Sequence, residues 1–185
     1  MVSVEYKKLG DIATYINGYA FKPEQRGSEG LPIIRIQDLT GNAYDLGYYN
    51  GDYPKKVELN DGDVLISWSA SLGVYLWNHG KALLNQHIFK VVFDKVEIDK
   101  FYFMYAVEYN LDKMSLKTHG ATMKHIQRNK LEQVFVVVPP SEIMAKYQEI
   151  ADPIRSTLLL LAKQINNLSE ARDRLLPKLM SGEVE

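Results

Sequence analysis

Hydrophobic and polar residues follow one period before Pro139-Pro140 and another after it. Before the two prolines, short apolar runs rich in Val, Ile and aromatic residues alternate with Gly, Asn and Asp, the pattern of strands joined by turns. We predict strands at residues 31–36, 64–68, 74–77, 87–93 and 134–138, the second and third forming a hairpin. After Asp99, a residue suited to cap a helix N-terminus, apolar residues recur every three or four positions. This spacing predicts a helix that ends near Asn110 to Lys113.

The segment after the two prolines has helical spacing throughout. Ser141 is the type of residue that caps a helix N-terminus, and Asp152 is a second such residue. Pro153 then falls at a first helical position, where its missing N–H is not needed, and Gly182 falls where helices commonly end. We therefore predict two helices, one beginning at Ser141 and one running from about Pro153 to Ser181.

The second of these helices carries an almost uninterrupted apolar stripe, broken only by Arg172. Its members recur at seven and four spacing, which places them on one helix face. The stripe consists of Ile154, Leu158, Leu161, Ile165, Leu168, Leu175 and Leu179. At 1.5 Å per residue the helix would be roughly 42 Å long, more than one compact domain of the remaining size can cover. We therefore expect the stripe to dock against another copy or another protein.

These elements predict an α+β protein in two parts. Residues 1–140 would form a mixed, mainly antiparallel β domain, and residues 141–185 a long, coiled-coil-like helical arm. The 185 residues are 46% hydrophobic, enough for one core with an appendage. No apolar run reaches the roughly 18 residues of a membrane span, and the first residues lack the layout of a secretory signal. We expect a soluble, cytoplasmic protein without a membrane partner.

The charge is distributed unevenly along the chain. The total is −1, but residues 113–140 contain five Lys or Arg against one Glu. A basic segment with small residues and histidines is typical of a loop that contacts phosphate. The alternative is a solvated surface face without a partner.

Three clusters carry the residue types that DNA recognition requires, Lys and Arg for phosphates and small polar side chains for base edges. The first contains Lys22, Arg26 and Arg35, and the second contains Ser67 and Ser69 with Gln86 as a possible neighbour. The third consists of Lys117, Thr118, His119, Gly120, Thr122, Lys124 and His125, with Arg128 following. Structural roles compete with these readings, because Trp68 and Trp77 are typical core residues and His87 has the setting of a hydrogen-bonded structural histidine.

The sequence contains no motif of an enzyme acting alone. The glycine patterns of phosphate-binding loops, dinucleotide folds and serine hydrolases are missing. With no cysteine and no paired histidine spacing, we expect neither a metal nor a cofactor. Asp61 and Asp63 flank Gly62 as turn residues rather than as metal ligands.

Read together, several short motifs resemble the target recognition domain of the specificity subunit of type I restriction-modification systems. In chain order they are Lys8–Ile12, Gly18–Lys22, Pro32–Ile36, Gly62–Ser67, Leu84–Ile88, Gly120–Thr122 and Val136–Pro140. The closing stretch Arg174–Glu183 is similar to the end of that family's helical spacer. Each motif alone is weak, whereas their order along nearly the whole chain is specific.

The resemblance implies a non-catalytic subunit that selects double-stranded DNA for a methyltransferase subunit and, in the full complex, for an endonuclease subunit. Members of that family usually carry two recognition domains and two spacers, whereas this sequence has one of each. We therefore expect a homodimer that pairs through the helical arm and reads a bipartite target with inverted-repeat halves. Two alternatives stay open. One is the recognition subunit of a related bipartite methyltransferase and nuclease system, and the other is an assembly scaffold that does not bind DNA.

Overall fold

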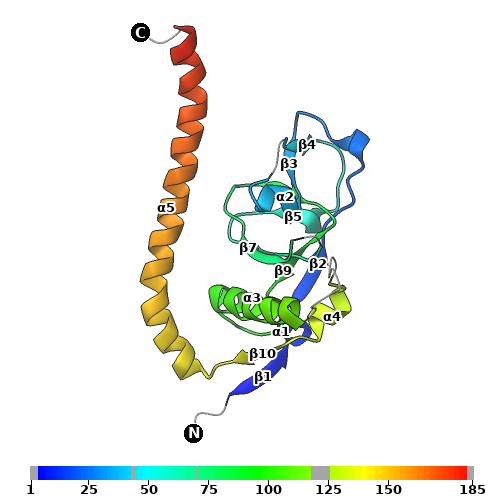
Figure 1. Ribbon diagram of the computed structural model, residues 1–185, viewed down its shortest axis with the longest axis vertical. Coiled ribbons are helices and arrows are strands. Elements are labelled where there is room, and N and C mark those ends of the chain that lie inside the picture. The colour runs from blue at the N-terminus through cyan, green and yellow to red at the C-terminus, as the bar shows by residue number, and fades with distance from the viewer. Residues whose placement is uncertain (1–3, 43–44, 70, 118–125, 183–185) are drawn as a thin grey trace. The chain divides into compact units, whose positions relative to one another are not determined.

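The computed structural model describes residues 4–42, 45–69, 71–117 and 126–182, with the side chains of residues 112–117 left out. The chain divides into two compact units, Met1–Pro139 and Pro140–Glu185 (Figure 1). Together they give a mixed α+β structure, as the sequence predicts.

The larger core of the first unit lies under an antiparallel sheet with strand order β2-β9-β6-β7. These strands are β2 (Thr14–Asn17), β6 (Val64–Ser67), β7 (Gly73–Leu76) and β9 (Ile88–Val92). The predicted hairpin is confirmed, because β6 pairs with β7 in antiparallel register from Val64↔Leu76 to Ser67↔Gly73. The central strands β6 and β9 are almost fully buried, which explains why they are apolar apart from Ser67 and Lys90.

A second sheet has the order β4-β3-β8-β5 and is mixed. Its strands are β3 (Leu31–Ile34), β4 (Gly47–Tyr49), β5 (Glu58–Leu59) and β8 (Ala82–Leu84). The central pair β3 and β8 is parallel, whereas β4 and β5 pair antiparallel at the two edges. The predicted strand at residues 31–36 is therefore too long, since the chain turns into the short helix α2 (Ile36–Leu39). The 3₁₀ turns η1 (Pro23–Gln25) and η2 (Lys55–Val57) belong to the connecting loops.

The first and last strands of this unit form a two-stranded antiparallel ribbon. β1 (Glu5–Lys8) pairs with β10 (Phe135–Val138), in register from Glu5↔Val138 to Lys8↔Phe135. Val136 faces the core and is 2% exposed. The short helices α1 (Leu9–Ile12) and α4 (Arg128–Glu132) pack together beside this ribbon.

Helix α3 (Lys100–Lys117) covers part of the larger core, next to β7 and β10. Its predicted cap is confirmed, because Asp99 Oδ1 accepts hydrogen bonds from the backbone N–H groups of Phe101 and Tyr102 at 3.0 and 2.9 Å. The predicted end near Lys113 was too early. Phe103 and Val107 lie on the buried face of this helix, whereas Tyr105 is 61% exposed.

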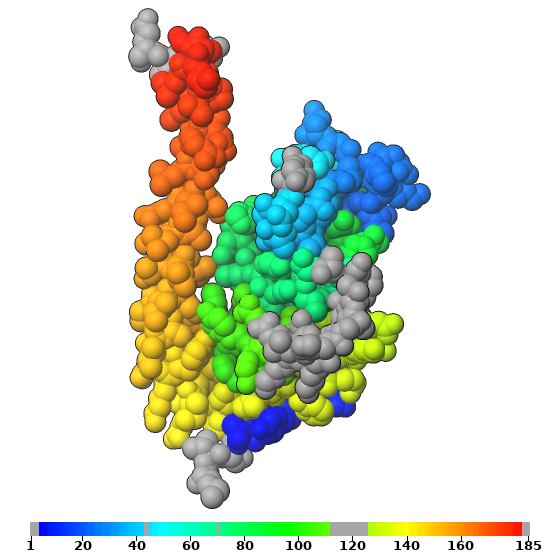
Figure 2. Space-filling view, viewed as in Figure 1, coloured from blue at the N-terminus to red at the C-terminus, as the bar shows by residue number. Residues whose placement is uncertain are grey.

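The second unit is a single helix, α5 (Ser141–Ser181), drawn as one rod of side chains in Figure 2. The predicted break at Asp152 was wrong, since the helix continues through Pro153. Asp152 does not cap a new helix but forms an ion pair with Arg155. Continuation requires no second nucleation step, which offsets part of the hydrogen bond lost at the proline. Gly182 ends the helix in a left-handed conformation with φ 74°, as predicted. Among the described residues, no helix is long and apolar enough to cross a membrane.

Candidate nucleic-acid interface

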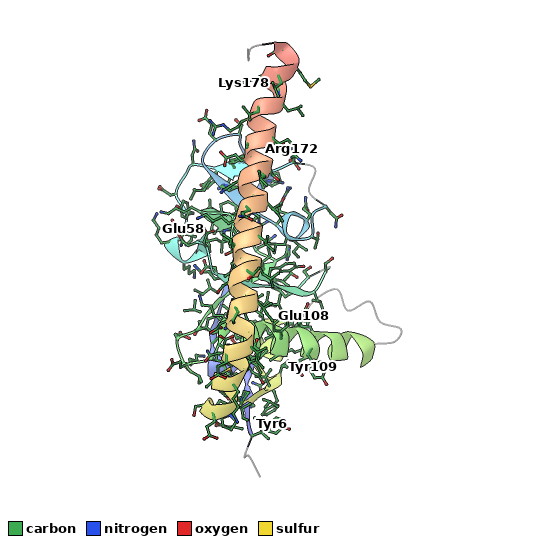
Figure 3. All side chains as sticks on the ribbon, turned by 90° about the vertical axis from the view of Figure 1, so that its left-hand side faces the viewer. Tyr6, Glu58, Glu108, Tyr109, Arg172 and Lys178 are labelled. Atoms are coloured by element: carbon green, nitrogen blue, oxygen red, sulfur yellow. The ribbon has the colours of Figure 1, made fainter. Side chains whose placement is uncertain are left out.

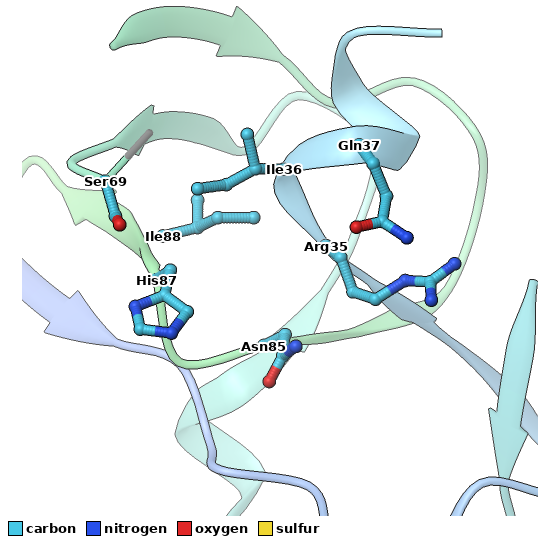
Figure 4. A pocket seen from close by; sticks show the side chains of 7 residues that line it. All are labelled: Arg35, Ile36, Gln37, Ser69, Asn85, His87 and Ile88. Atoms are coloured by element: carbon cyan, nitrogen blue, oxygen red, sulfur yellow. The ribbon is translucent and has the colours of Figure 1, made fainter. Parts of the chain in front are cut away.

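A cavity of about 240 Å³ opens in the first unit where its two sheets meet, and we call it the Arg35–His87 pocket (Figure 4). Its lining residues are Arg35, Ile36, Gln37, Ser69, Asn85, His87 and Ile88. Arg35 and Gln37 lie on one side, and Ser69 and His87 lie on the other. The pocket therefore gathers polar side chains from segments far apart in the sequence.

The parallel pairing of β3 and β8 brings one half of this pocket together. Strands that run in parallel end at the same sheet edge, so the residues after β3 and after β8 become neighbours. The Asn85 backbone N–H donates to the Ile34 carbonyl at 3.0 Å, which fixes the two strand ends side by side. Gly18 permits a third segment to approach, because a Cβ at that position would lie 2.0 Å from the Asn85 carbonyl oxygen.

The other half of the pocket comes from the antiparallel pair β6 and β9. Ser67 lies opposite Ile88 in register, so Ser69 and His87 follow on the same edge. The Trp68 backbone N–H donates to the His87 carbonyl at 3.3 Å. The sequence suggested Gln86 as a neighbour of the serine cluster, and in the structure the residues on either side of it, Asn85 and His87, line the pocket with Ser69.

His87 contributes a buried polar atom to the pocket. Its Nδ1 is buried and finds no hydrogen-bond partner in the part of the chain that the structure describes. The Trp68 indole packs against the imidazole at 5.2 Å between ring centroids and restricts its orientation. A buried imidazole nitrogen without a partner has lost its hydration without compensation, so a ligand group that pairs with it would bind favourably. The structural reading of His87 as a fully hydrogen-bonded side chain does not fit this geometry.

Arg35 is held tightly by neighbouring acids. Its Nε and Nη2 donate to the two carboxylate oxygens of Asp38 at 3.0 and 3.2 Å, and Nη2 also donates to the Asp45 carbonyl. The Asp38 hydrogen bond is the main cause of the raised pKa of Arg35, and burial opposes it. Since Asp38 also accepts from the Arg35 backbone N–H at 2.7 Å, this pair shapes α2 and the rim of the pocket.

The remaining candidates have varied surroundings. Lys22 is exposed and precedes η1, and Gln86 is half-buried with its backbone N–H bonded to Asn85 Oδ1 at 2.9 Å. Ser67 is fully buried and its hydroxyl donates to the Ser71 carbonyl, so it supports the loop from inside. Arg128 pairs with Glu132 at 2.7 Å on α4.

The third cluster cannot be placed in the same way. Lys117 is the last residue of α3, and its side chain is outside the description. The other members before Arg128 lie outside the described residues; they are Thr118, His119, Gly120, Thr122, Lys124 and His125. Their contact with DNA stays a prediction.

Gln37 is the pocket residue that sequence reasoning missed. It follows Arg35 after the end of β3, and its amide faces the cavity (Figure 4). The signal available in the sequence was the spacing of Arg35 and Asp38, an acid three residues after a strand end, which is typical of a capped helical turn. Such a turn would have placed Gln37 at the strand end beside Arg35.

The predicted apolar stripe lies on the surface of helix α5. All seven apolar members are exposed, with exposed fractions from 47 to 70%. Arg172, the interruption of the stripe, is labelled on this helix in Figure 3. An apolar face of this length is typical of a surface that contacts another protein.

Residues 1–170 match the family described as "Type I restriction modification DNA specificity domain". The chain belongs to this family. It is 28% identical over 153 residues to the EcoBI specificity subunit of Escherichia coli, covering 81% of this chain and 31% of that subunit. It is 30% identical over 195 residues to the MjaIX specificity subunit of Methanocaldococcus jannaschii, covering 97% of this chain and 44% of that subunit.

Solved structures of specificity subunits share the fold. The S subunit from M. genitalium superposes with a TM-score of 0.65 at 14% identity, covering 99% of this chain and 47% of that chain. The HsdS subunit from Thermoanaerobacter tengcongensis gives a TM-score of 0.61 at 19% identity, covering 97% of this chain and 44% of that chain. The chain thus spans less than half the length of the relatives it matches.

Proposed function

We propose that this chain is the DNA-reading part of a type I restriction-modification complex and carries no catalytic group of its own. It would read one half of a bipartite target in double-stranded DNA and position the methyltransferase and endonuclease subunits. Family membership supports the role in DNA specificity. The Arg35–His87 pocket, with its unpaired imidazole nitrogen, is the observation that supports assigning this role to particular residues.

The chemistry of the pocket suits base edges. Asn and Gln amides offer a donor and an acceptor side by side, the arrangement that pairs with adenine in the major groove. Gln37 and Asn85 supply two such amides, and His87 adds a nitrogen that donates or accepts according to its tautomer. The apolar side chains of Ile36 and Ile88 border them and would suit a thymine methyl group.

We further propose that two copies pair through α5. The exposed stripe supports this association because each copy offers the same apolar face, as a two-fold interface requires. Two identical readers would then select inverted-repeat halves, and the helices would set the length of the unspecific spacer between them.

The test of this function is a map of methylated bases in a host that carries this gene with its methyltransferase gene. We expect one bipartite motif whose halves are inverted repeats at a fixed separation. A motif with unrelated halves would contradict pairing of identical readers. Methylation that persists unchanged when this gene is deleted would contradict the recognition role itself and favour an assembly scaffold.

The pocket is tested separately with Gln37→Ala and His87→Ala. Each variant is expected to relax the choice of base at one position of the half-site, since a good base contact contributes about 1–3 kcal/mol of discrimination. Asn50→Ala serves as the control, because Asn50 is exposed and does not line the pocket. Unchanged motifs in both pocket variants would move base reading to another surface.

A further inference from the structure

Arg26 keeps the donor edge of its guanidinium buried and unused. Its Nε and Nη2 are both covered, yet neither finds a hydrogen-bond partner among the described residues. The side chain lies flat on Gly47, where a Cβ would stand 2.7 Å from Arg26 Nε. Buried donors without acceptors cost free energy, and the cost is larger for a charged group. Arg26 is therefore ready to gain from an acceptor that reaches this edge.

Arg35, in the same unit, shows which group can bind to the Nε and Nη2 atoms of an arginine. Its Nε and Nη2 grip both oxygens of the Asp38 carboxylate at 3.0 and 3.2 Å. Among the described residues, Arg26 forms an ion pair with Asp45 through Nη2, and the 3.9 Å between Nη2 and Oδ2 is too long for a hydrogen bond. The Nε and Nη2 donors of Arg35 are therefore both paired with a carboxylate, whereas those of Arg26 lack an acceptor with two oxygens at the matching spacing.

Asp45 lies between the two arginines and belongs firmly to neither. Its Oδ1 is 3.6 Å from Arg35 Nη2, and its side chain is 76% exposed. An exposed ion pair without good geometry contributes little to stability. Asp38 neutralises Arg35, so Asp45 is the balancing charge for Arg26. Another anion with two oxygens in a plane could take its place without changing the local charge.

We propose that Arg26 binds a backbone phosphate of duplex DNA and that Asp45 occupies this phosphate site in the free protein. On binding, the phosphate displaces the Asp45 carboxylate and forms the bidentate contact that Asp45 does not make. The Asp45 backbone carbonyl stays on Arg35 and keeps the loop attached. This inference rests on the proposed function, since it concerns how that same unit grips DNA. It adds a built-in competitor that weakens DNA binding by a defined amount.

The test is a double-mutant cycle on DNA affinity, measured with the full chain and a duplex in about 50–200 mM salt. Asp45→Asn removes the competing charge and is expected to tighten binding roughly three- to fivefold, the fold-change of an exposed ion pair. Arg26→Gln is expected to weaken binding and to flatten the log–log salt dependence by about 0.9, the value of one phosphate contact. Arg26→Lys should keep the slope but recover only part of the affinity, because lysine lacks the fork.

The decisive measurement is Asp45→Asn in the Arg26→Gln background, where the gain in affinity should vanish. If Asp45 merely repels DNA from the surface, the gain persists without Arg26, and the inference is wrong. Asp52→Asn is the matched control, since it removes an exposed aspartate charge that pairs with neither arginine. A gain from Asp52→Asn equal to that from Asp45→Asn would also overturn the inference.

Failure of this inference is distinguishable from failure of the proposed function. If the wild type binds duplex DNA but the cycle shows no coupling, only the displaced-carboxylate site is wrong. If neither the wild type nor any variant binds duplex, alone or with the methyltransferase subunit, the recognition role is wrong as well. Unfolding midpoints of the four proteins show whether a lost affinity reflects a damaged fold.

Discussion

Tyr15 is a fully buried residue whose ionisation is linked to folding. Its hydroxyl donates to the Leu9 carbonyl at 3.1 Å, and burial raises its pKa well above the ordinary value, with the negative charge of Glu132 adding to the effect. The unfolded chain loses this proton near pH 10, whereas the folded protein retains it. The folded state then binds more protons, so stability must fall as pH rises above about 10.

Tyr15→Phe should remove this contribution. We expect the variant to be about 1 kcal/mol less stable near neutral pH, since one hydrogen bond is lost. The difference should shrink or reverse above about pH 10, where only the wild type pays for keeping a buried phenol protonated. Urea unfolding at both pH values checks this, with Tyr6→Phe as the exposed control. Parallel alkaline losses in wild type and Tyr15→Phe would contradict it.

For single residues, the sequence showed which side chains could contact DNA, but it did not show which other groups those side chains bind in the folded protein. Arg35 was a reasonable candidate for DNA contact, but its partner Asp38 was not visible as a competitor until both were placed on one helical turn. The same applies to Ser67, whose hydroxyl bonds inside its own loop. Roles depend on which charged or polar group is nearest in space, and the carboxylate that pairs with Arg26 belongs to Asp45, 19 residues away in the chain.

The stripe of helix α5 gives a prediction at the scale of an element. Leu161→Asp with Leu168→Asp would place two charges in the apolar seam, where burial of an unpaired carboxylate is strongly unfavourable. The proposed dimer should then dissociate, as sedimentation would show. Ser156→Asp with Asn167→Asp is the control, because both exposed residues lie on the opposite helix face. A wild type that is monomeric at micromolar concentration would refute the dimer directly.

Pro153 gives a second prediction for this helix. Inside α5 it removes one backbone hydrogen bond, so Pro153→Ala should stabilise the helix locally by roughly 3 kcal/mol. Slower hydrogen exchange around residues 149–157 would show the gain. Pro177→Ala, one turn from the helix end, should gain less. If a new helix began at Pro153, alanine would bring little benefit there, because proline suits that position.

Five of the ten described strands, β3, β6, β7, β9 and β10, were predictable because their β-branched runs are bounded by turn residues, whereas the others are too short or too mixed in composition to show a pattern. The hairpin of β6 and β7 and the strand β10 follow directly from that pattern. The short helices α1 and α2 were not predicted, since one helical turn leaves too few residues to define a period. The error at Pro153 has a different origin: a proline after an aspartate is equally good evidence for a helix start and for a kinked interior.

At the scale of the whole molecule, strand order decided what the sequence could not show. No short stretch of the sequence indicates that β3 pairs in parallel with β8. The two strands are far apart in the chain, with 48 positions between Ile34 and Ala82. That pairing, together with β6 beside β9, creates the Arg35–His87 pocket from residues that are unremarkable separately. The helical unit required no strand order, because helical spacing runs along its 41 residues, roughly 61 Å, and the error there was confined to continuity through Pro153.

The ribbon of β1 and β10 bears on whether the first unit could be exchanged for another. Because the first and last strands of the unit are hydrogen-bonded to each other, the chain enters and leaves this unit at neighbouring points. A foreign domain closed by a similar ribbon could therefore be inserted as a cassette, with a junction at Pro139-Pro140, and α5 would need no redesign. Under the proposed function, exchange of this unit alone would change the DNA sequence that is read and leave the helix unaltered.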